Sequence, residues 1–430
     1  MHVIPRRLLI VTLTALLVCC PDVRAYSVLS HEAIIDSAWD AGIKPLLLAR
    51  FPNATPDELR QAHAFAYGGA IIQDMGYYPH GSHLFSDLTH YVRSGDFILA
   101  LIRDSQDLND YAFALGALAH YCADTNGHRL AVNVAVPILY PRLKKKFGAV
   151  VTYEDNPSAH LKTEFGFDVL EVAKGHYAPD SYHDFIGFEV AKPLLERAFA
   201  ETYSIPLQSV FGDLDKSLGS YRYDVSSLIP KATKVAWVLK KDDIKRDAPT
   251  MTERRFLYNL SRSSYEKRWG KVYQKPGFGS RVLAFFLAIL PKIGPLRTLS
   301  FRMPTPQAET LFMSSFNVTL TEYRRLLDNV RAGQLDLENP NFDVGAVTPP
   351  GAYFMQDDCY AELLDGLAKT QFKGVSPELR ANILAFYADP NAPIATKKNH
   401  KEWVRIMGEI DALKSVAPTA PAPSVIGTVR

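Results

Sequence analysis

The segment "DLNDYAFALGALAHYCADTNGH" (107–128) decides what kind of fold this chain has. It is apolar almost all round, which is typical of a helix in the centre of a protein. It nevertheless ends with His120, Asp124 and His128, spaced four residues apart. At about 100° per residue, such side chains project from one side of a helix. The sequence therefore predicts a buried central helix with imidazole and carboxylate groups on one face.

Helical patterns continue on both sides of this segment. Ser30 is an expected N-cap, and Thr-Pro-Asp-Glu at 55–58 is a typical helix start in which Thr55 caps and Pro56 fits the first turn. Sustained polar–apolar alternation is scarce, and no internal repeat is visible. We therefore expect an all-α, multi-helix fold with a C-terminal helical extension. Further helices are predicted at 30–51, 55–76, 156–175, 181–203, 209–241, 252–273, 308–333, 357–372, 376–389 and 399–414.

The N-terminus has the pattern of a secretory signal peptide over residues 1–25. A basic start, "MHVIPRR", precedes the short apolar run "LLIVTLTALLVCC", and "VRA" predicts cleavage after Ala25. An alternative is a lipoprotein anchored at Cys19 or Cys20. We expect an exported protein, periplasmic or secreted. Cleavage would make Tyr26 the new N-terminus, five residues before His31.

The pattern of the rest predicts a domain at 26–273, a helical region at 281–413 and a Pro/Ala-rich, disordered tail at 414–430. The boundary is the Gly/Pro-containing stretch "QKPGFGS" (274–280). Nine apolar residues at 282–290 are too few to cross a membrane, and they predict either a buried helix or an element resting on lipid. The formal charge of +2 on 430 residues gives no sign of a nucleic-acid partner.

Histidines gather in the first part of the chain. Eight of the twelve lie between residues 31 and 160. His160 and Glu164 repeat the four-residue spacing of His120 and Asp124, and side chains four apart on a helix can hold one ion from two sides. Zinc binds imidazole nitrogen and carboxylate oxygen, usually four ligands in all. Two such pairs, with His128 and loop residues nearby, supply more ligands than one ion needs. The spacing predicts a metal site with several ions.

The order of these residues resembles the zinc-dependent phospholipase C family. That family includes the catalytic domain of glycosylphosphatidylinositol-specific phospholipase D and is similar in fold to the zinc-dependent single-strand nucleases. The resemblance rests on His31, Asp74, His83, His120-x-x-x-Asp124, His128 and His160-x-x-x-Glu164. It implies an all-helical domain with three zinc ions.

The resemblance also implies how the ligands are shared. One ion would take the amine and carbonyl of Tyr26 together with His31. Asp124 would bridge this ion to a second one, and the remaining ligands would divide between the second and third ions: Asp74, His83 and His120 for the second, and His128, His160 and Glu164 for the third.

Two choices within this set stay open. His90, in "SDLTHY", is the rival of His83, which we prefer because "HLFSD" resembles the His-Phe-rich loop of the family. Tyr77, Tyr78 and Phe85 would either line a substrate pocket or fill the core.

The implied function is an exported zinc-dependent phosphodiesterase that hydrolyses phospholipid headgroups, with C-type cleavage preferred over D-type. Metal-activated water would attack phosphorus, and Asp74 would orient or deprotonate that water. A nuclease or nucleotidase with the same site is one alternative. A non-catalytic zinc-binding protein held to lipid is another.

Overall fold

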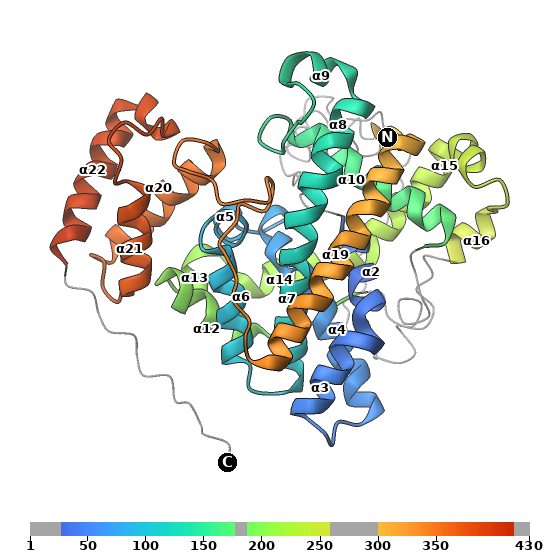
Figure 1. Cartoon of the computed structure of the whole chain (residues 1–430), viewed down its shortest axis with the longest axis horizontal. Coiled ribbons are helices and arrows are strands. Elements are labelled where there is room, and N and C mark those ends of the chain that lie inside the picture. Colours follow the sequence, from blue (N-terminus) through green and yellow to red (C-terminus); the bar gives the residue numbers. More distant parts are fainter. Residues whose placement is uncertain (1–26, 177–186, 259–299, 417–430) are drawn as a thin grey trace, which may run out of the picture.

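Helix α7 (Leu108–Gly127) runs through the middle of the computed structural model, and other helices surround it (Figure 1). The structure describes residues 27–176, 187–258 and 300–416. These ranges contain no strand, and their single β-bridge joins Asn341 to Ala346. The prediction of an all-α fold is confirmed.

The other elements follow in chain order. The first part contains α2 (Val28–Ala38), α3 (Lys44–Arg50), α4 (Pro56–Ile71), α5 (His83–Tyr91), α6 (Ser94–Asp104), α8 (Asn133–Leu139), α9 (Pro141–Phe147) and α10 (Pro157–Lys174). The next part contains α12 (Lys192–Tyr203), α13 (Leu207–Val210), α14 (Leu214–Tyr223), α15 (Ile229–Asp247) and α16 (Glu253–Tyr258). The last part contains α19 (Pro306–Ala332), α20 (Phe354–Lys369), α21 (Pro377–Phe386) and α22 (His400–Ser415). Short 3₁₀ or π-helical turns are η1 (Trp39–Ile43), η2 (Ile72–Tyr77), η3 (His128–Val132), η4 (Asp224–Leu228) and η6 (Ala395–Lys398).

Helices α4 and α7 pack with their backbones almost in contact. A Cβ added to Gly69 would lie 1.9 Å from the carbonyl oxygen of Phe113, and one added to Gly116 would lie 2.0 Å from that of Ala66. Only glycine fits at both positions, since no side-chain atom can approach a backbone oxygen so closely. This contact fixes the end of α4 beside the histidine-bearing half of α7.

The C-terminal region shares the core of the first part. Helix α19 lies along α7, where the Tyr323 hydroxyl donates a hydrogen bond of 2.8 Å to the Leu115 carbonyl (Figure 1). Between α19 and α20 the chain crosses the end of α7. There Gly345 has a φ of +67°, and a Cβ on it would lie 2.4 Å from the Thr125 carbonyl oxygen. Residues beyond 300 therefore reach the polar end of the central helix.

The expected helix starts are confirmed at one site and corrected at another. Thr55 accepts a hydrogen bond from the Glu58 amide, and the Glu58 carboxylate accepts one from the Thr55 amide, so the cap is complete. Helix α2, however, begins at Val28, two residues before the expected cap Ser30. Ser30 instead donates to Asp168 with a 2.9 Å bond, which ties α2 to α10.

Several predictions fall outside the described residues. They are the signal peptide at 1–25, the apolar run at 282–290, most of the helix at 252–273 and nearly all of the tail at 414–430. The predicted domain boundaries stay predictions. Within the described ranges, each helix is too short or too polar to cross a lipid bilayer.

Candidate metal centre

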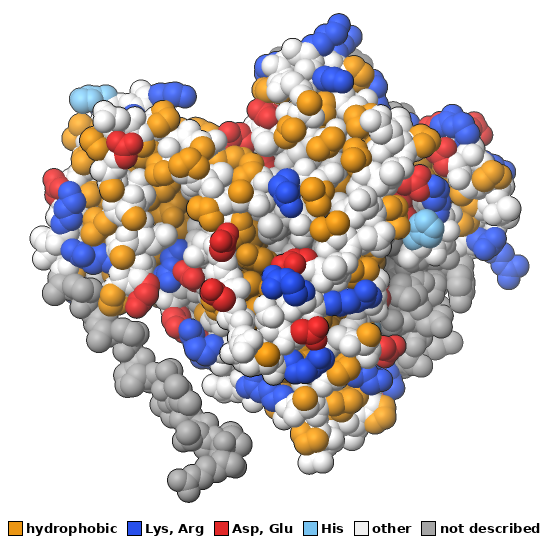
Figure 2. Space-filling view, in the orientation of Figure 1, with side chains coloured by type: hydrophobic (Ala, Val, Ile, Leu, Met, Phe, Trp, Pro, Cys, Tyr) orange, Lys and Arg blue, Asp and Glu red, His pale blue; other side chains and the backbone are white. Residues whose placement is uncertain are grey.

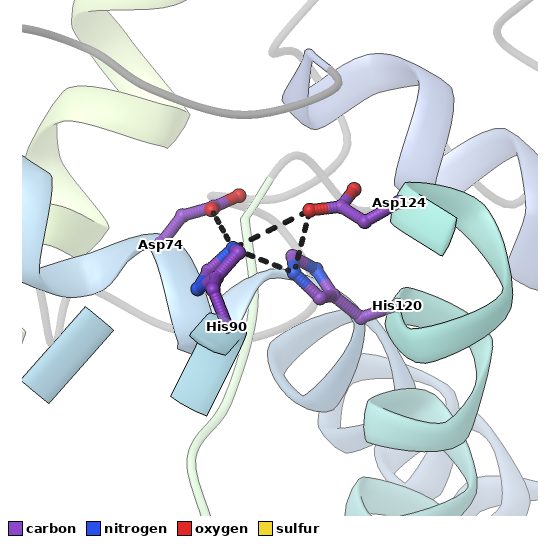
Figure 3. Close-up of side chains that lie close together, drawn as sticks. All are labelled: Asp74, His90, His120 and Asp124. Carbon is purple, nitrogen blue, oxygen red and sulfur yellow. Dashed lines mark hydrogen bonds and ion pairs between the residues drawn. The ribbon is translucent and has the colours of Figure 1, made fainter. Parts of the chain in front are cut away.

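Four side chains from three elements meet at the polar end of α7 (Figure 3). His120 and Asp124 come from α7, Asp74 from η2 and His90 from the last turn of α5. Nε2 of His90 lies 3.4 Å from Oδ1 of Asp74 and 3.3 Å from Oδ2 of Asp124. Nε2 of His120 lies 3.2 Å from the same Asp124 oxygen and 3.3 Å from Nε2 of His90. We call these four residues the α7 cluster.

Hydrogen bonds to the backbone fix the tautomers of both histidines. Nδ1 of His120 lies 2.9 Å from the Ala70 carbonyl oxygen, and Nδ1 of His90 lies 2.7 Å from that of Ser86. Because a carbonyl oxygen only accepts, each Nδ1 carries the hydrogen. In the neutral rings both Nε2 atoms are then lone-pair acceptors, and they face each other and Asp124. With Oδ1 of Asp74, the cluster then has four acceptor atoms directed at one another. Such an arrangement is stable only with a positive charge between the atoms.

A second group of ligands lies one turn further along. His128 in η3, His160 in α10 and Asp343 after α19 are close enough to share an ion. Oε1 of Glu164 lies 2.8 Å from Nε2 of His160 and 3.4 Å from Nε2 of His128. Oδ1 of Asp343 lies 3.6 Å from Nδ1 of His128. We call these four residues the α10 cluster.

Asp124 stands between the two clusters. Its Oδ2 faces His90 and His120, as described above, while its Oδ1 lies 3.3 Å from Nε2 of His31 and 4.0 Å from Nε2 of His128. The His31 ring also stacks on that of His120, with centroids 4.5 Å apart. The Asp124 carboxylate is thus surrounded by four imidazoles, from α2, α5, α7 and η3. A carboxylate placed in this way can bridge two cations.

The buried carboxylates of the two clusters have no lysine or arginine partner among the described residues. Four carboxylates are each at most 3% exposed and form ion pairs with histidines within the described ranges: Asp74, Asp124, Glu164 and Asp343. No oxygen of Asp74, Asp124 or Glu164 and no ring nitrogen of His128 or His160 has a hydrogen-bond partner there. Isolated buried carboxylates are very costly unless paired or bound to a metal. The residues present therefore fit divalent cations.

Burial and the neighbouring charged groups also shift the pKa values of the two clusters. Burial alone would raise the pKa of Asp124, but the neighbouring His120 and His128 hold it well below its usual range. Burial raises the pKa of Glu164 to about 7 and lowers that of His160. At His90 burial acts downward, yet Asp124 and Asp74 raise its pKa to about 10. Without a metal, these carboxylates draw a proton onto a ring that would otherwise bind a cation.

The structure brings together most of the predicted ligands. His31, Asp74, His120, Asp124, His128, His160 and Glu164 all lie in or beside the two clusters. Tyr26 lies outside the described residues.

The histidine from α5 is His90 and not the preferred His83. His83 is the first residue of α5 and is exposed, with its ring 5.8 Å from that of Tyr77. The two histidines are seven positions apart, which puts them on one face of the helix but about 10 Å apart along its axis. Only the later one reaches the end of α7.

The three aromatic candidates are buried. Phe85 is fully buried against Phe199 and Phe211, and Tyr78 packs on Tyr221, so both fit the core-filling alternative. Tyr77 lies nearer the site, since its ring is 5.7 Å from that of His90 and its hydroxyl donates to Asp87.

Sequence reasoning missed the contribution from beyond residue 300. The Phe342 amide donates a 3.1 Å hydrogen bond to the His90 carbonyl, and its ring lies 5.3 Å from that of His90 and 6.0 Å from that of His120. Asp343 follows directly. Neither residue lies in a helix, so no periodic spacing marked them.

Comparison with known proteins agrees with this geometry. Residues 30–213 match the family model described as zinc dependent phospholipase C. This part of the chain belongs to that family. The phospholipase C domain is accordingly a zinc-dependent hydrolase of the phosphodiesterase class, and it contains every residue of the two clusters except Asp343. No curated protein and no solved structure matches the chain.

Proposed function

We propose that the protein is an exported phosphodiesterase that removes phospholipid headgroups by C-type cleavage, with three zinc ions in its centre. The observation that carries this proposal is the α7 cluster, whose two bare Nε2 atoms and two carboxylates face one another inside the phospholipase C domain. Zinc, when bound, polarises phosphoryl oxygens and lowers the pKa of water. That chemistry suits the hydrolysis of a phosphodiester, whose charged oxygens repel anionic nucleophiles.

The clusters suggest how the ions are divided. Asp74, His90, His120 and Oδ2 of Asp124 would hold one ion. His128, His160 and Glu164 would hold another. His31 and Oδ1 of Asp124 would hold a third, together with the amine of Tyr26. His90 takes the place first expected for His83.

The Tyr26 amine is supported by the anchoring of its neighbour. The Ser27 hydroxyl donates to Oδ2 of Asp168, and the Leu29 amide lies 3.3 Å from the same oxygen. Asp168 lies four residues after Glu164 in α10, one helical turn from the α10 cluster. The residue that follows Tyr26 is therefore held near the centre, which is where a freed amino terminus would serve as a ligand. This requirement connects export and signal cleavage to metal binding.

Asp74 is the proposed catalytic carboxylate. It sits in the 3₁₀ turn η2, which is held by Ser86: the Ser86 hydroxyl accepts a 2.9 Å hydrogen bond from the Gly76 amide and donates to the Gln73 carbonyl. Asp74 is 1% exposed, and neither of its oxygens is used by another described hydrogen-bonding group. A fixed carboxylate with free lone pairs can orient a water molecule and accept its proton.

Contact with a lipid surface is supported by side chains around the second cluster. Val150 and Phe354 are 52% and 53% exposed, and each lies within three residues of Tyr153 or Tyr353, both of which donate to Asp343. Helix α9 adds the exposed basic residues Arg142, Lys144, Lys145 and Lys146. Figure 2 shows basic side chains on the projection formed by α9, and hydrophobic ones around the hollow between it and the C-terminal helices. Apolar and cationic groups together suit a phospholipid membrane.

The direct test compares substrates on the mature protein beginning at Tyr26. Zinc content is measured first, and then hydrolysis of phosphatidylcholine vesicles, phosphatidylinositol vesicles and single-stranded DNA is followed side by side. We expect release of a phosphorylated headgroup and diacylglycerol, and a loss of this activity of at least about 10²-fold in Asp74→Asn. Release of an unphosphorylated headgroup would contradict C-type cleavage. Faster hydrolysis of the DNA would favour the nuclease alternative, and zinc binding without any hydrolysis would overturn the enzyme proposal.

A further inference from the structure

Asp343 is held rigidly over the end of α7 by four hydrogen bonds. Its Oδ2 accepts one of 2.9 Å from the Tyr153 amide and one of 2.8 Å from the Tyr353 hydroxyl. Its own amide donates to Oδ1 of Asn341 over 3.0 Å, and its carbonyl accepts a 2.7 Å bond from Nδ2 of Asn133. The backbone and one carboxylate oxygen are therefore fully used by these contacts.

The other carboxylate oxygen has no such role. Oδ1 of Asp343 is buried, and it has no hydrogen-bond partner among the described residues. It lies 3.6 Å from Nδ1 of His128, whose Nε2 is turned toward Glu164 at 3.4 Å. The two nitrogens of one ring thus face different acids, one from α10 and one from beyond residue 300.

We propose that Asp343 is a positioning residue for the zinc ligand His128. With the ion bound, a small shift of the ring would close the 3.6 Å gap and let Oδ1 accept the hydrogen of His128 Nδ1, so that the bare Nε2 faces the ion that His160 and Glu164 would also bind. Histidines that bind metals commonly donate their second nitrogen to a carboxylate, which fixes the tautomer and the orientation of the ring. The inference rests on the proposed metal centre, and it assigns to that centre a residue outside the matched range 30–213.

The contacts of Oδ2 predict an unusual order of variant effects. In Asp343→Asn, the amide oxygen must take the place of Oδ2, because the Tyr153 amide can only donate. The amide NH₂ then faces Nδ1 of His128 and forces that nitrogen to accept. The hydrogen moves to Nε2, where it blocks zinc. In Asp343→Ala the ring is merely released and can still adopt either tautomer. Asp343→Asn should therefore bind zinc more weakly than Asp343→Ala.

Asp357 offers a matched control. It too is a buried aspartate of the C-terminal region, but its Oδ1 accepts from the Gly351 amide and its Oδ2 from the Ala395 amide, at 2.9 and 2.8 Å. Both oxygens accept from backbone amides, and these partners are not histidines. Asp357→Asn should lower the thermal stability of the apoprotein and leave zinc affinity unchanged.

The experiment is a zinc titration of the full mature protein against a chromophoric chelator, without any phospholipid. We expect the weakest zinc of Asp343→Asn to bind about 10–100-fold less tightly than in the wild type, with Asp343→Ala between them. Circular dichroism and the Tm of each apoprotein check that the variants fold.

Three results would overturn the proposal: unchanged zinc affinity in both variants, a milder effect of Asn than of Ala, or equal losses in the two. The last result would point to direct coordination by Asp343. Because no substrate is used, a failure of the phospholipase assay would not affect this outcome.

Discussion

Two regions of the molecule reach the metal centre by different means. The segment from His120 to Glu164 presents ligands from helices, in pairs four residues apart. The segment around Phe342 and Asp343 crosses the same centre without helical structure, held by contacts with Tyr153 and Asn133. The first region supplies atoms that would touch the ions, and the second orients and covers them. The comparison teaches that residues outside the matched range 30–213 lie against the candidate metal centre.

Replacement of Asp124, the carboxylate between the two clusters, should have the largest effect on zinc content and hydrolysis. In Asp124→Asn, one oxygen becomes an NH₂ group that faces either the α7 cluster or the side of His31 and His128. We expect a loss of more than one zinc ion per chain and a fall in hydrolysis of at least about 10²–10³-fold. Elemental analysis and vesicle assays measure both.

Cys122 provides the control on the same helix. It is buried in the core and takes no part in either cluster. Cys122→Ala should cost about 1 kcal/mol or less in unfolding free energy and retain every zinc ion. Equal zinc content in the two variants would refute the shared role of Asp124.

The two histidines of α5 give the next largest contrast. His90→Ala removes a bare Nε2 from the α7 cluster, whereas His83→Ala removes an exposed ring seven residues earlier. We expect His90→Ala to weaken binding of one zinc ion by about 10²-fold or more, and His83→Ala to match the wild type in a chelator titration. A loss of zinc in His83→Ala with none in His90→Ala would reverse the assignment.

A substitution at the glycine contact between α4 and α7 should have the smallest effect on zinc binding. In Gly116→Ala the new Cβ would meet the Ala66 carbonyl oxygen at 2.0 Å, so the helices must separate. We expect a loss of about 1–3 kcal/mol in urea unfolding, with slightly weaker zinc binding because Ala70 orients His120.

Gly366→Ala in α20 is the counterpart, because a Cβ there meets nothing within 4 Å. It should be neutral or stabilising by up to about 1 kcal/mol, since alanine favours helix more than glycine. If both substitutions had the same effect on unfolding, close packing of α4 and α7 would not be what holds the centre in place.

The sequence predicted what depends on regular spacing. The helix expected at 156–175 is observed as α10 (Pro157–Lys174), and the segment 107–128 contains α7 with its polar face intact. His120 with Asp124, and His160 with Glu164, could be placed together because one helical turn fixes their separation.

Features that depend on contacts between distant segments could not be predicted from the sequence. No helix was predicted over 83–91, so the axial distance between His83 and His90 in α5 could not be used to choose between them. The close approach of Gly69 and Gly116 depends on two helices whose register no local pattern reveals. Asp343 is separated from His128 by more than 200 residues and lies in no periodic segment.

Anomalous X-ray diffraction at the zinc edge, on crystals of the mature protein grown with zinc, tests the central claim most directly. A difference peak among Asp74, His90, His120 and Asp124, and another beside His128, His160 and Glu164, is the predicted result. Absence of density between the His90 and His120 rings would contradict the account, because a proton and not a metal would then hold these acceptors together.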